Sequence, residues 1–197
     1  DILQQFFQIG SGPPPIPHQI PSPPQDFVNR LGELKQLTRE HAKGIRTFLI
    51  HCPGSFGKTV LAYAFARELE HYYADGQIKV DLLGTGPQPL SVLAALGQVI
   101  HAFNPKQTIP DDQPEAEDQY QSCLHGKQVL LLLDNARDND QVEPLLPPQG
   151  CCLVVTSRPY LALPGCAEIL LSPLTAEAAI KPLPTPATEA STGQAAS

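Results

Sequence analysis

The hydrophobic pattern of the chain alternates between two kinds of segment. Short apolar runs predict strands, and VLLLLD at residues 129–134 is apolar up to its last residue, as a strand buried on both faces requires. Segments with apolar residues three and four positions apart predict helices. The expected strands are 46–51, 76–83, 127–134, 151–157 and 167–172, and the expected helices are 31–44, 58–74, 89–103 and 115–126. This alternation predicts an α/β fold with a mainly parallel five-stranded sheet covered by helices on both sides, in three layers.

The two ends of the chain break this pattern. Residues 11–24 are rich in proline, which lacks an N–H and fixes φ, so we expect residues 1–24 to form a mostly disordered linker. Residues 181–197 are rich in Pro, Ala, Thr and Ser and hold few large apolar groups. The sequence therefore predicts one folded domain at residues 25–178 and a disordered tail at 179–197. We expect residues 1–20 and 181–197 to pack poorly.

Composition narrows the function classes. The formal net charge is -7 and the 13 Lys and Arg residues form no basic run, so nucleic-acid binding is not expected. No apolar stretch reaches the roughly 18 residues of a membrane span, and no membrane partner is expected. The five cysteines are odd in number and form no C-x-x-C pair, which favours neither a disulfide framework nor zinc, and a cytoplasmic location is the expectation. The chain lacks methionine altogether, which suggests a fragment of a longer protein.

The stretch HCPGSFGKTVLA at residues 51–62 carries the first candidate chemistry. It lies between an expected strand and an expected helix, which is the order that a phosphate-binding loop needs. Gly57 allows the backbone to approach a phosphate, Lys58 would reach the β- and γ-phosphates, and the Thr59 hydroxyl would hold Mg²⁺. A chance G-K-T is the alternative.

The loop departs from the pattern G-x-x-x-x-G-K-[ST] at its first position, where Cys52 stands in place of glycine. If the φ angle of Cys52 is negative, cysteine is tolerated there. If it is positive, the substitution costs about 1 kcal/mol or more. The segment that ends in Gly57, Lys58 and Thr59 is intact, so we expect a working but weakened phosphate cradle.

Two further strands end in polar residues that should meet at the same edge of a parallel sheet. Asp134 ends the run VLLLLD and could hold Mg²⁺ through water, although it could also cap the following turn. Arg158 follows the apolar run VVTS, where a guanidinium could stabilise γ-phosphate charge; a plain surface arginine is the alternative. Asp134 and Arg158 are the candidate catalytic residues.

Taken in order, these motifs resemble the nucleotide-binding domain of the STAND-class P-loop NTPases, the NB-ARC group, in its bacterial form. The resemblance covers about residues 21–179. The segments that carry it are PSPPQDFVNRLGELKQL at 21–37, GSFGKTVLA at 54–62, DGQIKVDLLGTGPQPLSVLAALGQVIHAF at 75–103, GKQVLLLLDNARDNDQVEPLLPP at 126–148, CLVVTSRPYLALPG at 152–165 and LSPLTAEAA at 171–179.

The resemblance implies a P-loop NTPase fold with adenine nucleotide, ATP or ADP, and Mg²⁺ as ligands. It implies that Phe27, Val28 and Arg30 lie against the adenine and ribose, that Arg158 is the sensor arginine, and that Thr59 and Asp134 hold the metal. The loop residues that it implies as nucleotide contacts are Gly54, Ser55, Phe56, Gly57, Lys58, Thr59 and Val60. It also implies a strand order in which 46–51 lies at the centre, between 151–156 and 167–171, with 127–133 and then 76–81 beyond 151–156.

The sequence departs from the NB-ARC pattern at two positions. Asn29 replaces the glycine of F-V-G-R, and Asn135 stands where many hydrolytic relatives carry a second acid. The absence of that acid argues against a fast ATPase. The leading interpretation is an ATP/ADP-binding switch domain of a larger signalling protein, with slow or no hydrolysis, whose partners are other domains of the parent chain and further copies of itself. The alternative is a degenerate P-loop domain that serves as a protein-interaction or scaffold module without binding nucleotide.

Overall fold

A computed structural model describes residues 16–24, 30–54 and 57–172. Five strands form one parallel sheet in the order β2-β3-β4-β1-β5. They are β1 (Thr47–His51), β2 (Gly76–Asp81), β3 (Val129–Ala136), β4 (Cys152–Ser157) and β5 (Cys166–Leu170). The predicted α/β class and the predicted neighbours of every strand are confirmed. The middle position, however, belongs to β4, and β1 lies one strand from the edge.

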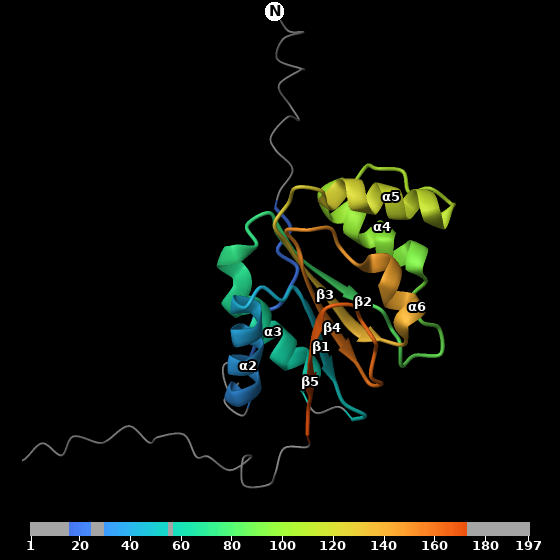
Figure 1. Cartoon of the computed structure of the whole chain (residues 1–197). Helices are drawn as coiled ribbons and strands as arrows, with labels where there is room; N and C mark the ends of the chain where they lie inside the picture. The colour runs from blue at the N-terminus through green and yellow to red at the C-terminus, as the bar shows by residue number, and fades with distance from the viewer. Residues whose placement is uncertain (1–15, 25–29, 55–56, 173–197) are drawn as a thin grey trace, which may run out of the picture.

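Helices cover both faces of this sheet, so the domain has three layers with the sheet in the middle (Figure 1). Helix α2 (Leu31–Ala42), helix α3 (Lys58–Leu69) and the 3-10 turn η1 (Glu70–Tyr72) lie on one face. The other face carries α4 (Val92–Phe103), α5 (Gln113–Leu124), α6 (Asn139–Val142) and the 3-10 turn η2 (Glu143–Leu145). The helix expected at 89–103 begins at Val92 because Ser91 is its N-cap, with the hydroxyl accepting from the Ala94 N–H at 3.2 Å.

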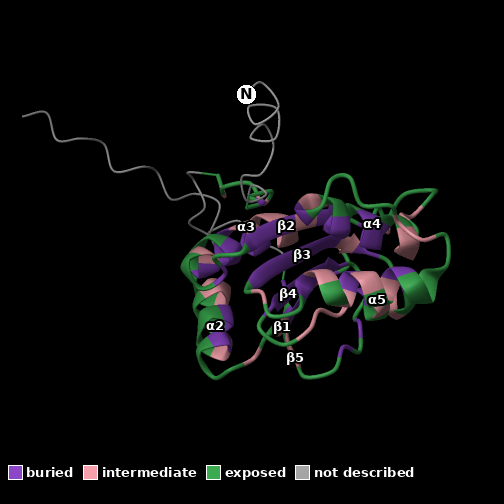
Figure 2. Ribbon diagram, turned by 90° about the horizontal axis from the view of Figure 1, so that it is seen from above, coloured by how far each residue is buried: buried purple, intermediate pink, exposed green. Residues whose placement is uncertain are grey.

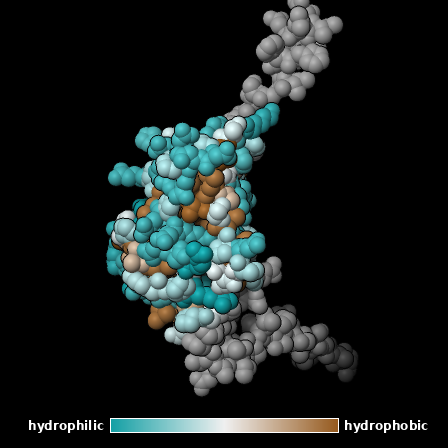
Figure 3. All heavy atoms as spheres, turned by 90° about the vertical axis from the view of Figure 1, so that its right-hand side faces the viewer, coloured by the Kyte–Doolittle hydropathy of each residue, from teal (hydrophilic) through white to brown (hydrophobic). Residues whose placement is uncertain are grey.

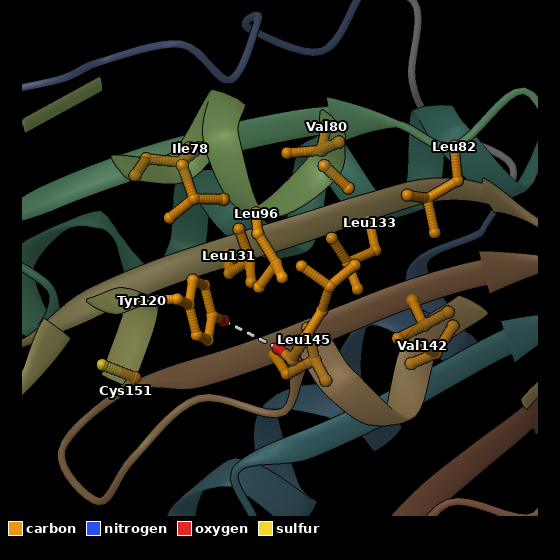
Figure 4. Close-up of a cluster of buried hydrophobic side chains, with 14 of the residues drawn as sticks. Ile78, Val80, Leu82, Leu96, Tyr120, Leu131, Leu133, Val142, Leu145 and Cys151 are labelled. Atoms are coloured by element: carbon orange, nitrogen blue, oxygen red, sulfur yellow. Dashed lines mark hydrogen bonds between the residues drawn. The ribbon is translucent and has the colours of Figure 1, made fainter. Parts of the chain in front are cut away.

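The buried side chains divide into two clusters, one on each face of the sheet, and strand β3 between them is mostly buried (Figure 2). Strand β4 is buried at every position, whereas in the edge strand β5 only Ile169 is buried. Strand β3 supplies both clusters, because successive side chains of a strand point to opposite faces. Leu131 packs with α4 and α5, whereas Leu132 packs with α3. Within the first cluster the Tyr120 hydroxyl donates to the Leu145 carbonyl at 2.7 Å, so its one polar group is satisfied (Figure 4). Seen from the side that bears α4 and α5, the outer surface is mostly hydrophilic, with smaller hydrophobic areas (Figure 3).

The described part of the proline-rich N-terminal segment touches the domain, although only Pro17 is buried among residues 16–20, and the expectation that residues 1–20 pack poorly stays a prediction. His18 forms a parallel bridge to Gln77 in the edge strand β2. The Gln77 N–H donates to the Pro17 carbonyl and the Gln19 N–H donates to the Gln77 carbonyl, both at 2.7 Å. The edge of β2 has free backbone groups that a short extended segment can satisfy, even where prolines prevent a longer strand. Residues 1–15 and 173–197 lie outside the described residues, and the predicted domain limits stay predictions.

Candidate functional site

The loop after β1 has the strand–turn–helix form that its sequence predicts. Gly57 precedes α3 with φ 84°, a left-handed conformation that glycine adopts without steric cost. The first turn of α3 then begins at Lys58, and the Leu61 N–H donates to the Gly57 carbonyl at 3.0 Å. Ser55 and Phe56 lie outside the described residues. A 12-residue helix therefore starts directly at the G-K-T segment, with the positive end of its dipole at this end of the sheet.

Cys52 fits the first position of the loop without backbone strain. Among the described non-glycine residues only Leu83 and Asn135 have a positive φ, so Cys52 takes a conformation that is ordinary for an L-residue. Its side chain is fully buried and its thiol donates to the Gly54 carbonyl at 3.1 Å. Its N–H donates to the Ser157 carbonyl at 3.3 Å, which joins the loop to the end of β4. The first of the two possibilities that the sequence leaves open for Cys52 holds.

The ammonium group of Lys58 turns back onto the loop. Its Nζ donates to the Gly54 carbonyl at 2.5 Å and to the Cys52 carbonyl at 3.2 Å, and it lies 3.5 Å from the Cys52 Sγ. The side chain is only partly buried, so the loop carbonyls hold the charge beside the helix N-terminus and not inside the core. An anion at this place would compete with those carbonyls for the same three N–H donors.

Asp134 is the centre of the site. Its carboxyl is 6% exposed, and its Oδ1 accepts from the Thr59 hydroxyl at 2.8 Å and from the Thr156 hydroxyl at 2.6 Å. Its Oδ2 lies 3.3 Å from the Lys79 Nζ. These partners come from α3, β4 and β2, so one carboxylate ties together three elements at the carboxyl ends of the strands. The structure brings Thr59 and Asp134 together, and their expected role as metal ligands stays a prediction.

Asn135 has a left-handed backbone with φ 59°. Its N–H donates to the Thr156 hydroxyl at 2.9 Å, and its carbonyl accepts from the Gly84 N–H at 2.8 Å. A Cβ at Gly84 would overlap the backbone of Asn135 and Arg137, so only glycine allows the loop after β2 to lie this close. The loop after β2 is thereby fixed against the end of β3.

These elements surround a pocket of about 380 Å³ at the carboxyl edge of the sheet. Its lining residues are Gly57, Lys58, Thr59, Val60, Asp81, Thr85, Asp134, Asn135, Thr156 and Arg158. Six of the candidate site residues meet at this pocket, although the elements that carry them are far apart in sequence: Gly57, Lys58, Thr59, Val60, Asp134 and Arg158.

Two lining residues were missed by the sequence interpretation. Asp81 pairs in register with Asp134 at the end of β2, and Thr85 lies in the loop that Gly84 fixes. Asp81 could have been found, because it is the last residue of a strand that was expected to be parallel to β3. Thr85 could not, because its position depends on the close approach of two loops.

Arg30 has a different environment from the pocket residues. It stands at the N-terminus of α2 and is 6% exposed. Its guanidinium forms an ion pair with Glu33 at 2.8 Å and donates to the Ser172 carbonyl at 2.7 Å. Phe27 and Val28, expected beside it against the base, lie outside the described residues. Gly54 contributes its carbonyl to Lys58, as described above, and Arg158 is exposed at the mouth of the pocket.

Across residues 16–24, 30–54 and 57–172 there is no cluster of three or more His, Cys, Asp or Glu side chains placed to hold a metal ion. The same part of the chain contains no helix that is both long and apolar enough to cross a membrane. The carboxyl edge of the sheet thus offers a mixed set of donors and acceptors: an ammonium group, a guanidinium, two carboxylates, three hydroxyls and one amide group around one pocket.

The fold and pocket define a parallel α/β domain with a polar site built at the carboxyl ends of its strands. No protein-family profile matches the chain. It is homologous to part of the regulatory protein AfsR of Streptomyces coelicolor, with 37% identity over 153 residues, which is 72% of this chain and 15% of that protein. It is also similar to AfsR of Streptomyces griseus, with 33% identity over 172 residues, 84% of this chain and 18% of that protein. The chain spans less than a fifth of the length of either relative.

Proposed function

We propose that this domain binds adenine nucleotide and acts as a switch within a larger regulatory protein, in the manner of the NB-ARC domains. The observation that carries the proposal is the 2.8 Å hydrogen bond from Thr59 to Asp134. It joins the start of α3 to the end of β3 at one pocket, so the two motifs that the sequence suggests for phosphate and metal are adjacent in space. The AfsR relatives support a regulatory role for the parent chain, since regulation is what their names state.

The pocket supports phosphate binding for three separate reasons. A Cβ placed at Gly57 would meet no atom of the described residues within 4 Å, so space is open there. The N-terminus of α3 favours an anion at this position. Lys58 supplies a cation whose carbonyl partners are neutral, and these are weaker acceptors than a phosphate oxygen. The volume of about 380 Å³ falls within the size range of small-molecule sites.

The residues present fit a magnesium ion in part. Thr59 and Asp134 supply hydroxyl and carboxylate oxygens on adjacent elements, and such oxygens are the ligands that Mg²⁺ takes alongside phosphate and water. When bound, the ion would neutralise phosphate charge. Both oxygens of Asp134 already have partners in the chain, Lys79 among them, so the ion would have to share or displace them.

Slow hydrolysis, or none, accompanies this proposal. Asn135 carries an amide at the position after Asp134, and an amide cannot take a proton from an attacking water. Arg158 is the residue that we assign to charge stabilisation around the phosphates, whereas Asp134, itself an anion, would act on them only through the metal ion. Arg158 is exposed at the pocket, where it could approach the γ-phosphate.

A second candidate function is a protein-interaction module that no longer binds nucleotide. The observation that favours it is the contact of Lys58 with the carbonyls of Gly54 and Cys52, because the loop already satisfies the cation that phosphate would need. The other domains of the parent chain, and further copies of it, are the proposed partners in either case.

The test is thermal unfolding with and without Mg-ADP, followed by an ADP titration at equilibrium. A ligand that binds only the folded state at about 100 times its Kd stabilises it by roughly 2.7 kcal/mol, so a shift of several degrees in Tm is expected. Thr59→Val removes the hydroxyl at the pocket and should reduce the shift, whereas Thr47→Val makes the same change at the opposite end of the β1–α3 unit and should not. No shift with the parent protein at millimolar ADP would favour the interaction module.

A further inference from the structure

Lys79 is a charged residue in a strand that is otherwise buried up to its last position. It is the fourth residue of β2, its side chain is 24% exposed, and both of its chain neighbours, Ile78 and Val80, are buried. A lysine in such a position needs a partner, because an unpaired ammonium group loses its hydration without compensation. The structure supplies two partners.

One partner is the carboxylate of Asp134, whose Oδ2 lies 3.3 Å from the Lys79 Nζ. The other is the Tyr63 hydroxyl of α3, which accepts from the same ammonium group at 2.8 Å. The Nζ also lies 5.3 Å from the centre of the Tyr63 ring. Tyr63 therefore fixes the lysine head between α3 and the end of β3, and it holds the positive charge against the carboxylate.

This arrangement takes up most of the acceptor positions of Asp134. An ionised carboxylate offers about four acceptor positions. The Thr59 and Thr156 hydroxyls occupy Oδ1, and the ammonium group of Lys79 lies beside Oδ2. A hydrated Mg²⁺ demands near-octahedral oxygen ligands and keeps several of its waters. It would have to approach a carboxylate that is already neutralised, with a like charge a few ångströms away.

We propose that Lys79 is a built-in counter-ion of Asp134, so that this domain binds adenine nucleotide with little dependence on Mg²⁺. The inference rests on the proposed nucleotide function, but the screening of Asp134 by Lys79 does not. Removing the lysine charge leaves a carboxylate with a free oxygen beside Thr59, which is a better place for a divalent cation. Lys79 thus determines the cation preference of the site without contacting the nucleotide.

The first measurement uses no nucleotide. Tm is recorded in EDTA and in 10 mM MgCl₂ for the parent and for Lys79→Met, which keeps the length of the side chain without its charge. The expected result is no Mg²⁺ effect in the parent and a rise of a few degrees in Lys79→Met. Lys79→Arg keeps the charge and should behave as the parent does. Lys127→Met is the matched control, because it removes the same charge from a lysine that lies over the Phe103 ring. Its Tm should not respond to Mg²⁺.

The second measurement is the ADP affinity with MgCl₂ and with EDTA. For the parent the two Kd values should agree within about threefold, and for Lys79→Met they should differ by about tenfold or more. If Lys79→Met does not fold, Tyr63→Phe replaces it. Losing the hydroxyl loosens the lysine head, so an intermediate Mg²⁺ response is expected.

The outcomes separate this inference from the proposed function. If the Tm response to Mg²⁺ is the same in the parent and in Lys79→Met, whether large or absent, the role of Lys79 is overturned. A parent protein whose ADP affinity rises tenfold or more with Mg²⁺ overturns it as well. If neither the parent nor any variant binds ADP but the Tm of Lys79→Met responds to Mg²⁺, the counter-ion role stands and the nucleotide function fails.

Discussion

The two ends of the parallel sheet treat titratable groups in opposite ways. At the carboxyl ends of the strands, Asp134 is surrounded by hydroxyls and by the ammonium group of Lys79, a setting made for charged forms. At the amino ends, His41 and Tyr73 share a hydrogen bond of 2.7 Å in the core. Burial there lowers the pKa of His41 to about 4, with Arg46 and His71 acting in the same direction, and burial raises the pKa of Tyr73. One end gives its buried carboxyl an ion-pair partner, and at the other end burial favours the neutral forms of His41 and Tyr73.

The difference follows from what a parallel sheet brings together. All carboxyl ends meet at one edge, so a single polar residue at the end of each strand is enough to make a pocket. At the amino ends of the strands lie the C-termini of helices and the turns that follow them, and no ligand site is proposed there. Substitutions at the amino end and in the middle should therefore change folding, whereas those at the carboxyl end should change binding.

The largest effect on stability is expected from a substitution in the middle of the sheet, and this loss is the reference against which substitutions at the two ends are compared. Leu131→Ala removes a fully buried side chain from β3 and should lower the free energy of unfolding by about 2–5 kcal/mol. Urea unfolding measures the loss. The ADP affinity of the protein that remains folded should not change; a loss of affinity as large as the loss of stability would mean that the site and the core are not separable.

Lys58→Ala should have the next largest effect, and it should appear in binding alone. It removes a charge-assisted contact of about 1.5–3 kcal/mol, so the affinity for ADP should fall by roughly ten- to a hundredfold. The contacts of this partly exposed lysine with the described residues lie within its own loop, so unfolding by urea should be nearly unchanged. Equal ADP affinity in the parent and in Lys58→Ala would show that phosphate lies elsewhere.

His41, at the amino ends of the strands, should make the stability of the protein depend on pH. His41 is neutral when folded, with its pKa lowered to about 4, and it takes up a proton near pH 6.5 when unfolded. The unfolded state therefore binds more protons between these values, and the contribution of His41 is present above pH 6.5 and lost as pH falls toward 4.

The measurement compares the parent with His41→Gln, whose amide can still bond Tyr73. The difference in stability between the two should shift by about 2 kcal/mol in favour of the variant between pH 7 and pH 5. Parallel pH profiles would contradict the neutral state of His41. ADP affinity at constant pH should be the same in both proteins.

Cys52→Gly should give the smallest effect. The loop keeps its course without the side chain because the φ angle of Cys52 is not positive, so ADP affinity should stay the same or improve slightly. Stability should drop by up to about 1 kcal/mol, since glycine adds freedom to the unfolded chain. Calorimetric titration with ADP and urea unfolding check the two parts. A tenfold loss of affinity would show that the Cys52 thiol takes part in shaping the cradle.

The strands were predictable from the sequence because their signals are local, whereas their order in the sheet was implied by the resemblance to the NB-ARC group. The run from Leu130 to Leu133 is buried at every position, and Asp134 ends it where a ligand site was expected. The contacts of Lys79 could not be foreseen, because the pairing with Asp134 depends on the strand register and on Tyr63 from α3. The position of Arg30 against Ser172 likewise depends on a contact across 142 residues. Residues that act alone at a strand end are predictable, and residues that act through a partner from another element are not.

The short bridge between His18 and Gln77 has a consequence for how the protein behaves in concentrated solution. An uncovered outer strand can recruit the same strand of another molecule and start an ordered aggregate. Here the backbone groups of Gln77 on the outer side of β2 are already taken by the Pro17 carbonyl and the Gln19 N–H, and the prolines at 17 and 21 offer no N–H to extend the bridge. The proline-rich segment thus reduces the free backbone that another strand could pair with on this side. We expect association of copies through this edge to be disfavoured.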